Sequence, residues 1–352
     1  PGERPPLSLR VAAALLALLS VAGGLCAEVP IAEFAENRGL TLSWDPFLEI
    51  GELSNGFDAL TFYPRSGALV LNHSRLVSRE AVSYRDGTVL LSEDAVSYIG
   101  TLFVPEHGGG GARVVAIVLD PGHGGRDPGA SHSHTIDGEE VPFVEKHIVL
   151  AVARDLEKML SARYPDREII ITRDTDVFLE LEERVEIANA VEVDPLDEIM
   201  IFVSIHANAS LNSKTYGYEV WYLPPEYERT GLVSSEEIGE GSETVLPVLN
   251  LIRDEEYTSE SIRLAGAILS GFDGTVGEES RNLGLKEEVW FVVRNAKMPS
   301  VLVELGYLTN SYEAEMMSDR AYLRKLTLGL YNGIAAYVES FERRFRSVGT
   351  AE

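Results

Sequence analysis

From residue 113 onward, apolar runs of strand length alternate with segments that repeat apolar residues at helical spacing. Helices are expected at 145–160, 179–191, 259–269 and 321–341. Strands are expected at 114–119, 168–172, 200–205, 219–223, 289–293 and 301–303. This alternation predicts an α/β fold, with a mostly parallel twisted sheet and helices on both of its faces.

The chain before residue 113 has a different pattern of apolar and polar residues. Residues 28–104 contain short alternating runs separated by turn signals such as Asn55-Gly56 and Asp86-Gly87, which predicts a small all-β module resembling a stalk. Residues 105–112 are rich in glycine and are expected to form a linker. The α/β domain then spans 113–345, with an acidic insertion at 224–260.

The first 27 residues read as an export signal peptide. Two arginines precede an apolar stretch at 11–22 that is too short to span a bilayer, and small residues then follow. We therefore expect an exported protein of the periplasm or cell wall. A buried N-terminal helix is the alternative, but the stretch has no amphipathic pattern. A lipid on Cys26 is a second alternative, which the large Leu25 fits poorly.

Charge and cysteine content exclude several functions. The chain has 30 basic and 56 acidic residues and a net charge of −26, so its field repels nucleic acids and anionic lipid surfaces. We expect no nucleic-acid partner and no membrane span. The single cysteine, Cys26, lies in the predicted signal, so the mature chain has no thiol nucleophile and no thiolate metal site.

Three predicted strands end in chemically active residues. The strand at 114–119 leads into Gly122-His123-Gly124, the strand at 200–205 into His206, and the strand at 301–303 into Glu304. Glu145 opens the helix at 145–160. Because ligands of open α/β sheets bind beyond the carboxyl ends of the strands, neighbouring strands would bring these side chains together.

Two neutral imidazoles and one carboxylate form a ligand set that suits a catalytic zinc ion with one position left for water. Glu145 is the better ligand because its helix fixes it, and Glu304 can then act as the base toward that water. Each residue also has a plainer interpretation. His123 could be only a turn residue, and His206 could be packed in the core.

Other candidates are weaker. His132 and His134 could form a short metal-binding tract, but their segment is expected to be an exposed loop, and His147 is expected on a helix surface. A serine hydrolase could be built on Ser204 and His206, yet the Gly-x-Ser-x-Gly turn and an aspartate partner are missing.

At residues 113–341 the chain resembles the zinc-dependent N-acetylmuramoyl-L-alanine amidases, the group called amidase type 3. Six segments carry the resemblance in order: VLDPGHGGRDPGA (118–130), EKHIVLAVARDLEKML (145–160), TRDTDVFLELEERVEIAN (172–189), FVSIHANAS (202–210), GYEVWYL (217–223) and NLGLKEEVWFVVRNAKMPSVLVELGYLTN (282–310). The resemblance implies that His123, Glu145 and His206 bind Zn²⁺ and that Glu304 is the catalytic carboxylate. It also implies a peptidoglycan substrate, cleaved between N-acetylmuramic acid and L-alanine of the stem peptide.

The sequence departs from the family at two places. The segment between His123 and Glu145 is longer than usual and holds Asp137, Glu139 and Glu140 as competing carboxylates. The acidic insertion at 224–260 occurs near the point where some family members carry a segment that occludes the zinc until an activator protein displaces it. We therefore hypothesise self-inhibition within residues 225–258; a solvated surface excursion is the alternative.

Two other functions remain open at this stage. A zinc carboxypeptidase or other peptidase would use the same residues on a different bond. A non-catalytic wall-binding protein or activator would keep the fold, but it would be expected to have lost one of the four residues, and all four are present. The β module faintly resembles stalk domains of bacterial surface proteins, including those named after copper amine oxidases, which suggests a localising role.

Overall fold

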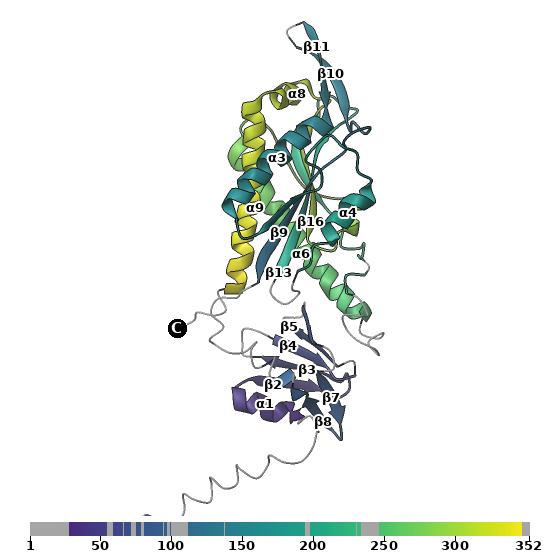
Figure 1. The fold of residues 1–352 in the computed structure, drawn as a ribbon, viewed down its shortest axis with the longest axis vertical. Helices are drawn as coiled ribbons and strands as arrows, with labels where there is room; N and C mark the ends of the chain where they lie inside the picture. Colours follow the sequence, from purple (N-terminus) through teal and green to yellow (C-terminus); the bar gives the residue numbers. More distant parts are fainter. Residues whose placement is uncertain are drawn as a thin grey trace, which may run out of the picture.

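A computed structural model of the protein describes residues 28–54, 59–65, 67–71, 75–78, 81–93, 95–96, 99, 112–136, 138–193, 198–229, 231–233 and 246–346. The predicted signal peptide, almost all of the predicted linker, and the turn at Asn55-Gly56 lie outside these residues. The described parts form a β-rich module at one end and an α/β domain above it (Figure 1).

The α/β domain is built on a six-stranded mixed sheet in the order β12-β9-β13-β16-β14-β15. Its strands are β9 (Arg113–Pro121), β12 (Glu168–Ile171), β13 (Glu198–Asn208), β14 (Tyr218–Tyr222), β15 (Asn282–Glu287) and β16 (Ser300–Tyr307). All neighbouring pairs are parallel except β14 and β16, which are antiparallel. The central strands β9, β13 and β16 are almost wholly buried, as their uninterrupted apolar runs predict.

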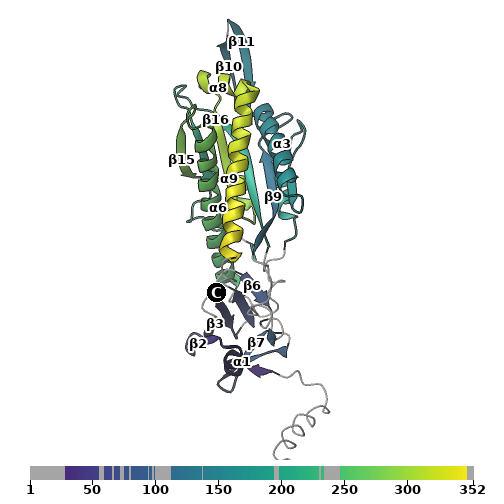
Figure 2. The same ribbon diagram turned by 90° about the vertical axis from the view of Figure 1, so that its left-hand side faces the viewer.

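Helices cover both faces of this sheet, which confirms the predicted α/β architecture. One face carries α3 (Glu145–Arg163), α6 (Leu246–Val276) and α9 (Arg320–Arg346), which lie side by side in Figure 2. The other face carries α4 (Leu181–Asn189) and the short α7 (Phe291–Asn295). The helix α8 (Ser311–Ser318) follows β16 and is capped by Asn310, whose side chain accepts from the Glu313 amide.

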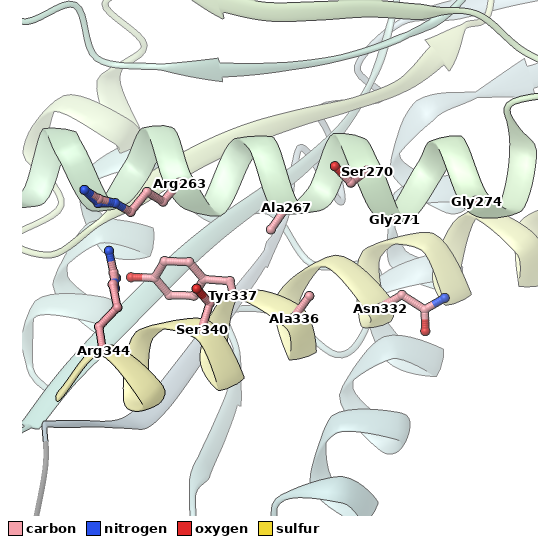
Figure 3. Close-up of a pocket in the computed structure, with 10 residues that line it drawn as sticks. All are labelled: Arg263, Ala267, Ser270, Gly271, Gly274, Asn332, Ala336, Tyr337, Ser340 and Arg344. Atoms are coloured by element: carbon pink, nitrogen blue, oxygen red, sulfur yellow. The ribbon is translucent and has the colours of Figure 1, made fainter. Parts of the chain in front are cut away.

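Two long helices, α6 and α9, touch through glycines. A Cβ atom on Gly271 would lie 2.2 Å from the carbonyl oxygen of Gly329, and one on Gly333 would lie 2.5 Å from Cα of Ile268. The missing side chains therefore permit backbone contact between the helices. Beside this contact lies a hollow of about 690 Å³ lined mainly by small residues of the two helices (Figure 3).

Two predicted elements of the α/β domain differ from those observed. Residues 289–293 were expected to form a strand, but α7 begins at Phe291, and the strand beside β14 is β15 instead. Val292, Val293 and Ala296 are buried at helical spacing while Phe291 is exposed, so a short apolar run alone did not distinguish the two. The helix expected at 259–269 begins thirteen residues earlier, at Leu246, and Pro247 does not interrupt it because proline is tolerated in a first turn.

The segment at 131–134 was expected to be an exposed loop, and the loop assignment is wrong. Residues 131–144 form an antiparallel hairpin of β10 (Ser131–Ile136) and β11 (Glu139–Val144), which projects at the end of the molecule opposite the β-rich module (Figure 1). Phe143 of the hairpin joins the core cluster of the α/β domain. The extra length between His123 and Glu145 is therefore an ordered hairpin.

The N-terminal module is rich in strands but also contains α1 (Ile31–Arg38), which the alternating pattern did not predict. One sheet has the order β1-β8-β7 and a second has the order β2-β3-β4-β5-β6. Their bounds are β1 (Val29–Pro30), β2 (Thr41–Asp45), β3 (Ile50–Ser54), β4 (Ala59–Tyr63), β5 (Ala68–Leu71), β6 (Arg75–Ser78), β7 (Val82–Arg85) and β8 (Thr88–Leu91). The predicted turn at Asp86-Gly87 joins β7 to β8, with positive φ at both residues.

The described parts of the acidic insertion lie at the amino end of the sheet. Arg229 donates to Asp254 at 2.7 Å and to Oγ of Ser300, the first residue of β16, at 3.3 Å. Val233 and Leu249 form a small apolar cluster with Val70 of the N-terminal module. These contacts involve the first residue of β16 and the N-terminal module, not the carboxyl ends of the strands, and self-inhibition within residues 225–258 stays a hypothesis. Residues 230 and 234–245 are not among the described residues.

Within the described ranges, no helix combines the length and the apolar character needed to cross a bilayer.

Candidate metal centre

The site lies at the carboxyl ends of three adjacent strands. β13 pairs with β9 on one side and with β16 on the other, so the predicted neighbour relation is confirmed. His123 follows β9, His206 lies near the end of β13, and Glu304 lies in β16. The helix α3 begins at Glu145, as expected, and places that side chain over the same end of the sheet.

Three predicted ligands come together. Nε2 of His123 lies 3.1 Å from Oε2 of Glu145, and Nδ1 of His206 lies 2.9 Å from its Oε1. One nitrogen from each histidine and one carboxylate oxygen all lie within 4.8 Å of one another. The two rings meet edge to face, with centroids 5.0 Å apart. His123 thus contacts Glu145 from its turn, and His206 contacts the same carboxylate from β13.

Glu145 is held as a buried carboxylate. Its oxygens accept hydrogen bonds from the amides of Ala130 at 2.7 Å and Ala207 at 2.9 Å. Burial alone would raise the pKa of Glu145, but its hydrogen bonds with His123 and His206 and the charges of both imidazoles lower it far below the ordinary value. The side chain is thus ionised at neutral pH, as a metal ligand must be.

His123 is oriented by a second carboxylate that the sequence analysis missed. Its Nδ1 donates to Oδ2 of Asp127 at 2.8 Å, while its Nε2 faces Glu145. Burial would lower the pKa of His123, but the contacts with Glu145 and Asp127 outweigh it and raise the pKa. The signal in the sequence was the aspartate four residues after the histidine. A carboxylate on the far nitrogen fixes the tautomer of a metal-binding imidazole.

Two glycines leave room for these side chains. A Cβ on Gly122 would lie 2.2 Å from Cε1 of His206, and one on Gly129 would lie 2.4 Å from Oε2 of Glu145. Gly129 also has φ of +68°, which L side chains rarely adopt. Gly124 and Gly125 instead approach the segment at 177–178. The glycine-rich turn therefore leaves room for the side chains of the site and for the neighbouring segment at 177–178.

Glu304 lies beside the cluster in a different environment. It is in register with His206 on one side and with Glu219 on the other. Its Oε2 is buried and accepts no hydrogen bond from the described residues. Burial first, and then the charges of Glu145 and Glu219, raise the pKa of Glu304 well above its ordinary value. An unsatisfied buried carboxylate oxygen on a residue in register with His206 is typical of a functional group.

The donor set fits a zinc ion. Nitrogen from two imidazoles and oxygen from one carboxylate are the ligands of catalytic zinc sites, and the Glu145 carboxylate is already ionised. The competing carboxylates Glu139 and Glu140 lie exposed on β11, and Asp137 is outside the described residues. Glu145 is thus the carboxylate that the fold brings to both histidines.

The weaker candidates lie elsewhere. The tilted rings of His132 and His134 on β10 have centroids 4.6 Å apart, and Nε2 of His134 contacts the carbonyl of Leu308. His147 is exposed on α3, as expected. Oγ of Ser204 is fully buried and donates to Asp120 at 2.8 Å, so this serine is not available as a nucleophile. The hollow between α6 and α9 is lined by none of the site residues.

Similarity to known proteins identifies the family of this chain. Residues 117–336 match the family model described as N-acetylmuramoyl-L-alanine amidase, a span that contains every residue of the cluster. The chain belongs to this family. The matched range begins within β9 and ends within α9, so it covers the whole sheet apart from the first residues of β9.

Two relatives named AmiA agree with the family match. The chain is 30% identical to the N-acetylmuramoyl-L-alanine amidase AmiA of Escherichia coli K12, over 67% of this chain and 79% of that protein. It is 29% identical to AmiA of Salmonella typhimurium LT2, over 65% and 78%. A solved N-acetylmuramoyl-L-alanine amidase from Clostridium difficile 630 is 26% identical, covering 65% of this chain and 99% of that one, with a TM-score of 0.48.

Proposed function

We propose that the protein is an exported zinc amidase that cleaves the amide between N-acetylmuramic acid and the L-alanine of the peptidoglycan stem peptide. Membership of the amidase family and the names of its relatives support the bond and the substrate. The observation that carries the chemistry is the pairing of the His123, Glu145 and His206 cluster with a buried carboxylate, Glu304, beside it.

In this proposal the metal is held by His123, Glu145 and His206. Zinc bound to such a set supplies Lewis-acid polarisation of the scissile carbonyl and makes a nearby water more acidic. Asp127 keeps the proton of His123 on Nδ1, which leaves Nε2 free to act as a ligand. Gly122 and Gly129 keep the space around the donors clear of side chains.

Glu304 is the general base of the proposed reaction. Its carboxylate accepts a proton from the attacking water and passes that proton to the leaving amine of L-alanine. The absence of a hydrogen-bond donor to Oε2 from the described residues leaves that oxygen available to a water molecule. Its raised pKa brings its proton affinity nearer to that needed for shuttling a proton at neutral pH.

The test compares the wild-type protein with Glu304→Ala on purified peptidoglycan, with zinc content measured in both. We expect new L-alanine amino termini with the wild type only, and full zinc in both proteins. New amino termini other than L-alanine would support a peptidase instead. New reducing sugar ends would refute an amidase.

A second variant tests the ligand role. His206→Ala is expected to lose bound zinc while keeping its secondary structure by circular dichroism, because one of three protein ligands is gone. Stoichiometric zinc in that variant would contradict the role of His206 as a ligand.

Export and domain organisation are part of the same proposal. Residues 1–27 act as the signal, 28–104 as a separate module, and 105–112 as the linker to the catalytic domain at 113–345. The small residues near Ala27 and the substrate outside the cytoplasm support this order. Mass spectrometry of the mature N-terminus tests it: a chain beginning near Glu28 is expected, and an intact N-terminus would contradict it.

A further inference from the structure

Two buried arginines surround the turn that carries His123. Arg173, which follows β12, and Arg184 on α4 are each only 2% exposed. Together they donate to the carbonyl oxygens of three successive residues, Pro121, Gly122 and His123. His123 itself has φ of +59°, in the left-handed region that non-glycine residues rarely adopt.

Arg173 bridges the two segments that carry metal-binding candidates. Its Nε donates to Pro121 O at 2.9 Å, and its Nη2 donates to Gly122 O at 2.6 Å and to Lys146 O at 3.1 Å. Lys146 follows Glu145 in the first turn of α3. One guanidinium therefore ties the His123 turn to the helix end that presents Glu145.

Arg184 is held by an ion pair with a buried aspartate. Its Nη1 lies 2.7 Å from Oδ1 of Asp120, which also accepts from Oγ1 of Thr172 at 2.7 Å. The same Nη1 donates to Pro121 O at 2.8 Å, and Nη2 donates to His123 O at 2.5 Å. The charge of Arg184 is thus balanced by Asp120, while its remaining donors reach the turn.

We propose that Arg173 and Arg184 are positioning residues for metal binding, which hold the main chain at Pro121–His123 so that Nε2 of His123 faces Glu145. The carbonyl oxygens they bind would otherwise be buried without partners or free to rotate with the turn. A turn held at its carbonyl groups keeps the strained φ of His123, which in turn fixes the direction of the imidazole.

Arginine suits this positioning role better than lysine does. A planar guanidinium presents five donors in a fixed fork, so one side chain can reach carbonyl groups of two segments at once. A lysine keeps the charge but offers a single flexible ammonium group. Arg173→Lys therefore separates charge from geometry, which a substitution by an apolar residue would not.

The inference rests on the proposed function in one respect: it takes His123 and Glu145 as zinc ligands. The proposed function and the positioning role can fail separately. If the wild-type protein does not bind zinc, the proposed function fails. If the wild type binds zinc and the arginine variants bind it equally well, only the positioning role fails.

The experiment measures zinc affinity of Arg173→Lys by competition with a chromogenic chelator, starting from metal-free protein. We expect affinity about 10–100-fold below wild type, the range typical when a partner that orients a ligand is removed. The visible absorption spectrum of the cobalt-substituted variant is expected to differ from that of the wild type, because the imidazole no longer holds one orientation. Thermal unfolding of the metal-free forms reports stability separately.

Arg229→Lys is the matched control. Arg229 is also a buried arginine, 3% exposed, but it binds Asp254 at the amino end of the sheet. The Arg229→Lys substitution is expected to lower the unfolding temperature without changing zinc affinity or the cobalt spectrum. If Arg173→Lys does not fold, Arg184→Lys carries the same test. Wild-type zinc affinity and an unchanged cobalt spectrum in a folded arginine variant would overturn the proposal.

Discussion

His123 and Asp127 form a hydrogen bond of 2.8 Å between Nδ1 and Oδ2, on the side of the imidazole away from Glu145. Oδ1 of the same aspartate accepts from the amide of Gly129 at 3.0 Å. Asp127 therefore connects the orientation of His123, a proposed zinc ligand, to the conformation of the loop at Gly129. We expect that Asp127, although it is outside the proposed ligand set, affects metal binding.

The first prediction concerns Asp127→Ala. Without the carboxylate, Nδ1 of His123 loses its acceptor and the ring is free to turn, so zinc affinity is expected to fall about 10–100-fold. Chelator competition measures this. Asp155→Ala, which removes an exposed carboxylate on α3, is the control and should leave the affinity as it is. Equal affinities for the two variants would argue against the orienting role.

The second prediction concerns space around the ligands. Gly129→Ala places a methyl group 2.4 Å from Oε2 of Glu145. Gly138→Ala has a similar positive φ, +85°, but meets no atom within 4 Å. Both variants carry the cost of a strained backbone, so only Gly129→Ala is expected to lose zinc. The measurement is zinc content after dialysis; loss in both variants, or in neither, would show that the close contact is not decisive.

The third prediction is a pH dependence of stability. Burial would raise the pKa of Asp120, but the charge of Arg184 and the hydrogen bonds from Thr172, Arg184 and Ser204 lower it below its ordinary value. A depressed pKa in the folded state means that Asp120 stabilises the fold above the unfolded pKa of about 4, and that this is lost as the pH falls through the folded pKa.

Asp120→Asn tests this dependence. At pH 7 the variant leaves Arg184 without its carboxylate, so the free energy of unfolding is expected to fall by about 3–5 kcal/mol. The difference from wild type should shrink as the pH drops below about 4, where Asp120 takes up a proton in the unfolded wild-type chain, and it should vanish once the pH is below the lower pKa of the folded state. Urea unfolding of the metal-free proteins at several pH values measures it. A difference that is independent of pH would mean that shape, not charge, accounts for the effect.

Much of the site could be predicted because its residues end apolar strands. The runs at 114–119 and 200–205 are long enough to identify buried strands, the run at 301–303 was assigned to a strand beside them, and parallel strands present their carboxyl ends at one edge. The residues that support the ligands could not be predicted in the same way. Arg173 and Arg184 act through main-chain carbonyl groups, and hydrogen bonds to the backbone leave no pairing signal in side-chain types.

The errors have local causes. The stretch at 289–293 is apolar but only five residues long, a length at which a strand and a helical turn share one pattern. The hairpin at 131–144 has polar residues on both faces of β10, so no alternation marked it. The contact between the insertion and the N-terminal module joins residues as distant as Val70 and Leu249, which periodicity within one segment cannot detect.

The last prediction separates a structural from an inhibitory insertion. Leu249, 4% exposed, packs with Val70 and Val233, away from the metal centre. Leu249→Ala is expected to lower the free energy of unfolding of this region by about 2–5 kcal/mol, the usual range for a buried leucine. Val248→Ala, at an exposed position of the same helix, is the control and should have little effect. Because the cluster lies at the other end of the sheet, activity on purified peptidoglycan per folded molecule should stay at the wild-type level. Self-inhibition through this part of the insertion would instead raise that activity in Leu249→Ala, since a loosened segment would uncover the site.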